Sequence, residues 1–414
     1  MSLSHGREHL AIPGPSVAPD RVLRAMHRAS PNIYEGELIA LTDSVLADLR
    51  RVAGAEGAEP AIYLGNGHAA WEAAVVNVLA PGERALALAT GRFGPGWAEV
   101  ARRAGVDVEL LDFGFRAAAD PQRLEDRLRA DRAGAIRAVM TVQTDTASAA
   151  RNDVPALRAA IDAAGHPALL MVDCIASLGS EEFRMDAWGV DVTVGACQKG
   201  LMTPAGVAFT WAGPRAMAER VDARSAYWDW GPRLHPEIFY QRFAGTPPSQ
   251  HIYGLREALT MILDEEGIEA VWARHAALAG AVWAAVEAWG ARDAALALNI
   301  ADPAARSHAV TTIRTAPEVA ARLRRWSAAK TGLTLGVGLA GGPAAQHDLF
   351  RIGHMGHLNA PMLLGALGVI EAGLTALGVP HGAGALDEAA RAVAEAASAA
   401  PRETIALESL PSVG

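Results

Sequence analysis

The stretch Val192-Thr-Val-Gly-Ala-Cys-Gln-Lys199-Gly200 places an apolar, strand-like run directly before a lysine. Lys199 is one of only two lysines in the 414-residue chain, where nearly every other positive charge is an arginine. A bias in composition also explains that rarity, so the position of Lys199 carries more weight. A lysine in apolar surroundings can lose its proton and form a Schiff base, whereas an arginine guanidinium stays protonated. We therefore expect a site that uses a neutral amine.

On both sides of this stretch, short apolar runs alternate with amphipathic, helix-like segments between residues 60 and 212. This alternation predicts an α/β fold in which a mostly parallel sheet is covered by helices. The strand-like runs are 61–64, 84–88, 106–111, 138–142, 168–172, 190–194 and 207–211.

The ends of the chain carry other patterns. Helical spacing of Leu and Val runs from 19 to 51 with one interruption at 31–36, and a long helical pattern runs from 251 to 290. Strand-like runs at 309–313 and 349–352 then alternate with helical segments, which indicates a second, smaller α+β domain. The expected organisation is an N-terminal arm at 1–20, a large domain at 21–264, a small C-terminal domain at 265–400 and a mobile tail at 401–414.

The composition is that of a soluble globular protein, with 51% hydrophobic and 20% charged residues. A net charge of −9 gives no reason to expect nucleic acid or an anionic membrane as a partner. The two cysteines, Cys174 and Cys197, cannot form a disulfide framework and fit a reducing compartment. The N-terminus lacks the features of a signal peptide, and no long uncharged apolar run occurs, so we expect a cytoplasmic protein.

Asp173 and Lys199 each follow a strand-like run. Side chains at the carboxyl ends of parallel strands converge on one crevice, so both residues are expected to face the same pocket. Pyridoxal phosphate requires such a pair, because a lysine binds its aldehyde and an aspartate keeps its ring nitrogen protonated. A buried Lys–Asp ion pair without a cofactor is the alternative interpretation.

The run Gly65-Asn-Gly67-His68 places small residues between a strand and a helix, where backbone amides can bind a phosphate. Gly65-x-Gly67-x-x-Ala70 also matches the dinucleotide fingerprint. The next strand-like run is followed by Thr90-Gly91, without an acid for a ribose, which favours a phosphate over a dinucleotide.

Further candidates follow other strands. Phe93 lies in a Gly-rich loop, where its ring either stacks on a flat cofactor or packs on the core, and Thr146 offers a hydroxyl. Arg351 has apolar neighbours and suits a substrate carboxylate or an acid at a domain interface. His354 and His357 lack supporting carboxylates or cysteines nearby, so we expect no metal site.

Six motifs in order over residues 10 to 380 resemble the class V aminotransferases of PLP fold type I, and within them the alanine–glyoxylate and serine–glyoxylate aminotransferases. The resemblance implies a large domain with a mostly parallel seven-stranded sheet and helices on both faces. The motifs are Pro13-Gly-Pro-Ser16, Gly65-Asn-Gly-His68, Val172-Asp-Cys-Ile-Ala-Ser177, Gln198-Lys-Gly200, Gly245-Thr-Pro-Pro248 and Phe350-Arg-Ile-Gly-His-Met-Gly356.

The resemblance implies pyridoxal 5'-phosphate as cofactor, with Lys199 as the Schiff-base lysine and proton shuttle and Asp173 as the partner of the ring nitrogen. Phe93 would stack on the ring, and Thr146 would lie near its hydroxyl. The residues implied to hold the phosphate are Gly67, His68 and Gln198.

The family resemblance also implies a homodimer with shared active sites. Thr246 would reach the partner's phosphate, and Phe243 stands where many relatives have a tyrosine. Arg351 matches the arginine that binds the substrate carboxylate. The implied reaction moves an amino group from a small donor such as serine or alanine to glyoxylate or pyruvate.

Two departures leave the amino donor open. The segment 32–37 differs from the sequence common in serine–glyoxylate enzymes, and Asp145-Thr146-Ala-Ser-Ala replaces the usual Glu-Ser/Thr-Ser-Thr-Gly. Pyridoxamine–pyruvate aminotransferases share the Arg351 motif but carry an acid where this chain has His68. The sequence also leaves open a PLP lyase and, from a different class, an NAD-dependent oxidoreductase.

Overall fold

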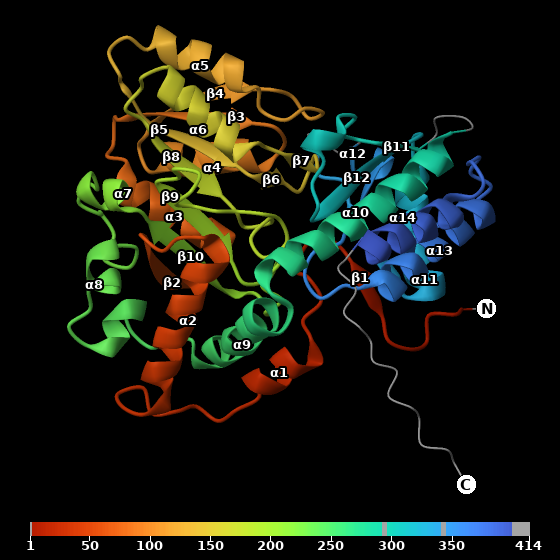
Figure 1. The fold of residues 1–414 in the computed structure, drawn as a ribbon, viewed down its shortest axis with the longest axis horizontal. Helices are drawn as coiled ribbons and strands as arrows, with labels where there is room; N and C mark the ends of the chain where they lie inside the picture. Colours follow the sequence, from red (N-terminus) through yellow and green to blue (C-terminus); the bar gives the residue numbers. More distant parts are fainter. Residues whose placement is uncertain (1, 292–295, 341–344, 400–414) are drawn as a thin grey trace.

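The computed structural model describes residues 2–291, 296–340 and 345–399. It contains a larger sheet, on the left in Figure 1, and a smaller sheet on the right. The larger sheet has seven strands in the order β2-β10-β9-β8-β5-β3-β4. β10 is antiparallel to both neighbours, and the remaining neighbouring pairs are parallel. The prediction of a mostly parallel seven-stranded sheet is therefore confirmed. The strands are β2 Glu59–Gly65, β3 Arg84–Ala89, β4 Asp107–Asp112, β5 Ile136–Val142, β8 Leu169–Asp173, β9 Val192–Ala196 and β10 Gly206–Ala212.

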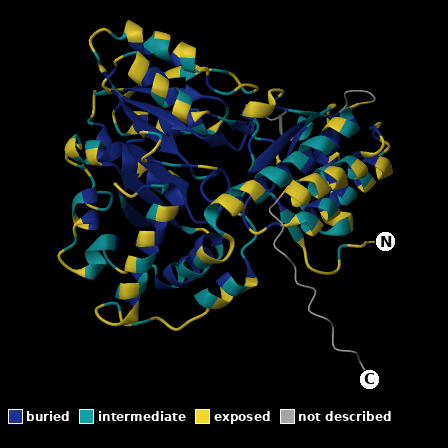
Figure 2. Cartoon of the chain, viewed as in Figure 1, coloured by how far each residue is buried: buried dark blue, intermediate teal, exposed yellow. Residues whose placement is uncertain are grey.

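Helices cover both faces of this sheet because its strands are apolar on both sides. In β3, Leu86 and Leu88 join the core cluster of one face, whereas Ala85 and Ala87 join the cluster of the other. The strands are accordingly buried and the outer faces of the helices exposed (Figure 2). The helices are α3 Gly67–Val78 and α4 Phe93–Arg103 on one face, and α2 Glu37–Ala53, α5 Pro121–Ala130 and α6 Val154–Ala163 on the other.

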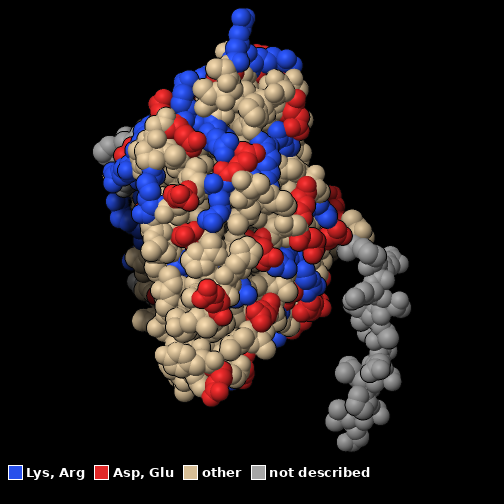
Figure 3. Space-filling model, turned by 90° about the vertical axis from the view of Figure 1, so that its left-hand side faces the viewer, with Lys and Arg blue, Asp and Glu red and all other residues tan. Residues whose placement is uncertain are grey.

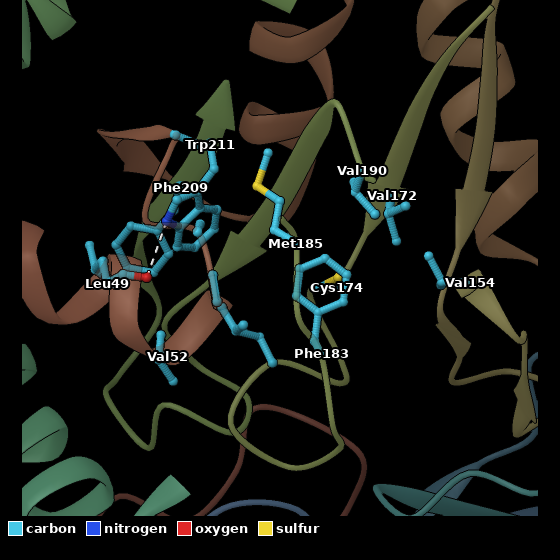
Figure 4. Packing of buried hydrophobic residues seen from close by; sticks show 14 of the residues in the cluster. Leu49, Val52, Val154, Val172, Cys174, Phe183, Met185, Val190, Phe209 and Trp211 are labelled. Carbon is cyan, nitrogen blue, oxygen red and sulfur yellow. Dashed lines mark hydrogen bonds between the residues drawn. The ribbon is translucent and has the colours of Figure 1, made fainter. Parts of the chain in front are cut away.

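Cys174 lies in the core of the α2 face, where it packs as a small buried apolar residue. Figure 4 draws it in one cluster with Val172 and Phe183. The indole of Trp211 is fixed there by a hydrogen bond to the Leu49 carbonyl at 3.1 Å. Both cysteines are free and buried.

The smaller sheet has five strands in the order β1-β13-β14-β12-β11. Its edge strand β1 (His9–Ala11) comes from the N-terminal arm and pairs in parallel with β13. Neither this strand nor its partner β13 was predicted from the sequence. The other strands are β11 Leu296–Leu298, β12 Val310–Thr315, β13 Leu333–Val337 and β14 Leu349–Gly353. The accompanying helices are α10 Ile268–Gly290, α11 Val319–Thr331, α12 Ala345–Asp348, α13 Ala360–Ala376 and α14 Ala385–Ala399.

The single helical pattern expected over 251–290 is divided in the structure. α9 (Ser249–Leu259) continues into a π-helix at Thr260–Glu266, and α10 begins after Gly267. Gly267 has φ +84, a left-handed conformation that favours glycine and ends the first helix. Shorter elements are α1 Asp20–Met26, α7 Pro214–Ala218, α8 Trp230–Leu234 and the hairpin strands β6 Thr144–Asp145 and β7 Ala150–Arg151.

The domain boundary near residue 265 stays a prediction, and the expected tail at 401–414 lies outside the described residues. Within the described ranges, no helix is long and apolar enough to cross a membrane. The face shown in Figure 3 carries side chains of both charge signs.

Candidate active site

A cavity of about 250 Å³ opens at the carboxyl ends of β5, β8 and β9. It brings together most of the predicted site residues, although they are far apart in the sequence. Its lining includes Gly67, His68, Phe93, Thr146, Asp173, Gln198 and Lys199, and also Asn66, Trp71, Val142, Thr144, Ile175 and Ala176.

Asp173 is the last residue of β8 and is only 3% exposed. Its carboxylate accepts hydrogen bonds from the Trp71 indole at 2.8 Å and from the Ile175 backbone N–H at 2.7 Å. Burial raises the pKa of Asp173 to about 7, although these two donors and the charge of Lys199 oppose the increase. The carboxyl group therefore lies close to its titration point at neutral pH.

Lys199 lies just beyond β9, and the N-terminal segment covers it. Its Nζ donates to the Pro13 carbonyl at 2.5 Å, and the Ser16 hydroxyl donates to the Lys199 carbonyl at 2.7 Å. A Cβ on Gly14 would stand 2.2 Å from Nζ, so only glycine permits this close approach. Burial, followed by the charge of Arg351, lowers the pKa of Lys199 to about 8.

The N-terminus of α3 borders the cavity, which Asn66, Gly67 and His68 line. The Asn66 side chain caps the helix by accepting from the His68 N–H at 3.1 Å. A Cβ on Gly67 would lie 2.4 Å from Ile175 Cδ1, so the glycine lets the backbone approach this wall. The His68 ring packs on Trp71 with centroids 4.5 Å apart, and burial lowers the pKa of His68, which favours the neutral imidazole. These features suit a phosphate.

Phe93 begins α4 and lines the cavity. Its backbone N–H donates to Asp145 Oδ2 at 2.7 Å, while Asp145 Oδ1 accepts from the Ala147 N–H at 2.9 Å. A Cβ on Gly91 would stand 2.3 Å from the carboxyl carbon of Asp145. The buried Asp145 therefore fixes the Phe93 loop against the turn that carries Thr146.

Arg351 lies on β14, outside the lining of the cavity but near enough for its charge to lower the Lys199 pKa. Nε donates to the Val337 carbonyl at 2.6 Å and Nη1 donates to the Thr146 carbonyl at 2.8 Å. Within the described ranges, Nη2 has no hydrogen bond to protein and is free for a substrate carboxylate. Burial lowers the Arg351 pKa to about 10, so the group stays charged.

The two residues expected to act across a dimer interface do not line the cavity of their own chain. Thr246 is exposed. Phe243 is 2% exposed and packs in the core, with its ring 5.6 Å from that of Phe239. Their proposed roles toward a partner subunit stay predictions.

The histidines of the Arg351 motif have separate surroundings. His354 is fully buried, with its ring nitrogens hydrogen-bonded to the Thr311 hydroxyl and the His308 carbonyl, whereas His357 is exposed. Among the described residues, no cluster of three or more His, Cys, Asp or Glu side chains is placed to hold a metal ion.

Sequence reasoning missed Trp71 and assigned Asp145 no role. Trp71 lies four residues after Gly67, one turn further along the same helix, so its indole reaches the same cavity. That spacing was a usable signal for Trp71. The role of Asp145 depends on the fold of the loop that holds Phe93, and the sequence carries no local sign of it.

The residues of the cavity fit pyridoxal 5'-phosphate in three places. Lys199 supplies a desolvated amine, Asp173 supplies a buried carboxyl group for the ring nitrogen, and α3 presents the positive end of its dipole to the phosphate. Phe93 lines the same cavity. The fold and these groups define the class of protein: a PLP-dependent enzyme of fold type I.

Comparison with known proteins agrees with this class. The model of the family Aminotransferase class-V matches residues 14–324. The chain is 39% identical to the serine–glyoxylate aminotransferase of Methylorubrum extorquens, over 90% of this chain and 92% of that protein. It is 34% identical to the L-aspartate–glyoxylate aminotransferase of Paracoccus denitrificans, over 89% and 91% of the two chains.

A solved structure extends the similarity to the whole fold. The pyridoxamine–pyruvate aminotransferase from Mesorhizobium loti superposes with a TM-score of 0.85 at 27% identity, covering 94% of this chain and 98% of that chain. The chain belongs to the class-V aminotransferase family. Membership in this family gives no support to the alternative interpretation of the chain as an NAD-dependent oxidoreductase.

Proposed function

We propose that this enzyme transfers the amino group of a small amino acid, of the serine or alanine type, to glyoxylate or pyruvate. The observation that carries the proposal is the meeting of Lys199 and Asp173 in one buried cavity beside Arg351. The names of the relatives from M. extorquens and P. denitrificans support glyoxylate as the acceptor and a small amino acid as the donor.

When bound, pyridoxal phosphate supplies an aldehyde that bonds the substrate amine and a ring that delocalises the electrons left by the departing α-proton. Lys199 takes that proton at Nζ and returns it, because a pKa of about 8 leaves part of the amine neutral near neutral pH. Asp173 would keep the ring nitrogen protonated by accepting a hydrogen bond from it. Gly67, His68 and Gln198 would bind the phosphate, and Phe93 would cover the ring.

Arg351 orients the substrate through its carboxylate. Two of its nitrogens are fixed by the Val337 and Thr146 carbonyls, so the guanidinium has a defined direction before the substrate arrives. A fixed guanidinium pairs well with a planar carboxylate and places the α-carbon near Lys199. The proposed substrates all carry such a carboxylate.

The active enzyme is proposed to be a cytoplasmic homodimer. The two reduced, buried cysteines fit that compartment, and the exposed Thr246 fits a contact with the partner's phosphate.

A half-reaction screen tests the proposal. The visible absorbance of the bound cofactor is followed while serine, alanine, aspartate and pyridoxamine are added one at a time. Loss of the band with serine or alanine, and its return on adding glyoxylate or pyruvate, is the expected result. A response to pyridoxamine alone would favour the pyridoxamine–pyruvate reaction, and ammonia release without an acceptor would favour a lyase.

A further inference from the structure

The two sheets meet at the segment 144–150, which also forms a wall of the cavity. Arg351 on β14 donates to the Thr146 carbonyl, and Thr312 Oγ1 on β12 donates to the Ala147 carbonyl at 3.0 Å. Thr312 and Arg351 are register partners in the smaller sheet. The place of β12 on this segment therefore determines where the Arg351 guanidinium stands relative to Lys199.

Glu181 sits in this joint and is completely buried. Its Oε2 accepts from the Thr144 hydroxyl at 2.9 Å, on the cavity wall. Its Oε1 accepts from the Ser307 hydroxyl at 2.6 Å and from the Ala309 N–H at 3.1 Å, in the loop that leads into β12. One carboxylate thus ties the cavity wall to the start of the strand that pairs with the strand of Arg351.

Burying the carboxylate of Glu181 costs desolvation free energy. Among the residues that the structure describes, Glu181 forms no ion pair with an Arg, Lys or His side chain. The neighbouring His308 favours its neutral form, because burial lowers its pKa more than the charge of Glu181 raises it. A neutral side chain would avoid the desolvation of a charge. A carboxylate, however, accepts several short, charge-assisted hydrogen bonds at once and so holds three donors in one geometry.

We propose that Glu181 is a positioning residue for the amino donor: it clamps the 307–309 loop to Thr144 and so sets Arg351 at the distance from Lys199 that the substrate requires. This inference rests on the proposed aminotransferase function. Glu181 does not line the cavity itself, so its effect reaches the substrate through Arg351. Loss of the clamp weakens binding of the substrate carboxylate more than binding of the cofactor.

The test compares Glu181→Ala and Glu181→Gln with Glu182→Gln, the neighbouring carboxylate in an exposed ion pair with Arg184. We expect the KM for the amino donor to rise about tenfold in Glu181→Ala and about threefold in Glu181→Gln, with kcat and cofactor absorbance changed much less. The effect of Glu181→Gln is expected to be smaller because its amide oxygen can still accept hydrogen bonds from the 307–309 loop and its amide nitrogen can donate one to the Thr144 hydroxyl. Glu182→Gln should match the wild type.

A double-mutant cycle separates positioning from general stability. On an Arg351→Lys background, replacing Glu181 should raise the KM little further, because the group through which it acts is gone. An equal rise on both backgrounds, or a loss of kcat with unchanged KM, would overturn the inference. If Glu181→Ala does not fold, Glu181→Gln carries the same comparison. Failure of the proposed function is distinct, because wild type and Glu182→Gln would then show no transamination either, which overturns both proposals.

Discussion

Asp173 and Lys199 have opposite charges, and burial shifts the pKa of each toward neutrality. The Asp173 pKa rises to about 7 and the Lys199 pKa falls to about 8, because both side chains lose water in the same cavity. The hydrogen bonds from the Ile175 N–H and the Trp71 indole keep the pKa of Asp173 from rising further. The resulting groups can each gain or lose a proton near neutral pH, as an acid–base site needs.

The raised pKa of Asp173 predicts a pH-dependent stability of the cofactor-free protein. Between pH 3.8 and about 7 the folded state binds more protons at this group than the unfolded state. The free energy of unfolding should therefore fall as the pH rises through this window, by up to about 4 kcal/mol at about 1.4 kcal/mol per pKa unit. Urea unfolding at several pH values measures it.

Asp173→Asn removes this titration and should flatten that part of the curve. Asp162→Asn, an exposed carboxylate at the end of α6, serves as the control and should leave the slope unchanged. A wild-type slope that persists in Asp173→Asn would show that other groups cause it.

The sequence was sufficient to predict Asp173, Lys199 and Gly67 as neighbours, because each follows a strand of one parallel sheet and such strand ends share an edge. It was not sufficient for contacts that depend on how loops fold. Asp145 fixes Phe93 across 52 positions, and Pro13 contacts Lys199 across 186. No local pattern reports these pairs.

At the scale of elements, the strands of the large sheet were predictable because each is an apolar run flanked by polar turns. β1 and β11 have only three residues each and owe their strand conformation to neighbours. β13 was also missed, although the alternation of apolar and small residues in Leu333–Val337 was a usable strand signal. The end of the helix at Gly267 could have been predicted, since a glycine inside a helical pattern often ends a helix.

At the scale of the whole molecule, the N-terminal arm and the smaller sheet both converge on the cavity. β1 joins β13, the following segment covers Lys199, and β14 delivers Arg351. The sequence indicated two sheets but not their relative placement, which depends on contacts such as those of Glu181.

The proposed dimer predicts complementation between inactive chains. Thr246→Ala and Lys199→Ala are each expected to have reduced activity. In a mixed dimer, the Lys199→Ala chain would supply an intact Thr246 to the intact Lys199 of its partner, so co-expressed chains should exceed the mean of the two variants. Lys199→Ala with Asp173→Asn is the control with no gain, because both residues line one cavity within a single chain. No gain in the first pair would exclude a shared site at Thr246.

Covalent binding of the cofactor by Lys199 can be tested through the visible absorbance of the purified protein. We expect the wild type to show the band of a lysine-bound cofactor and Lys199→Ala to lack it, whereas Lys330→Ala, a change at the other lysine, should retain it. Reduction with borohydride should fix the cofactor to the peptide that contains Lys199. A wild-type protein supplied with pyridoxal phosphate that shows no such band, or a Lys199→Ala variant that keeps it, would contradict the account.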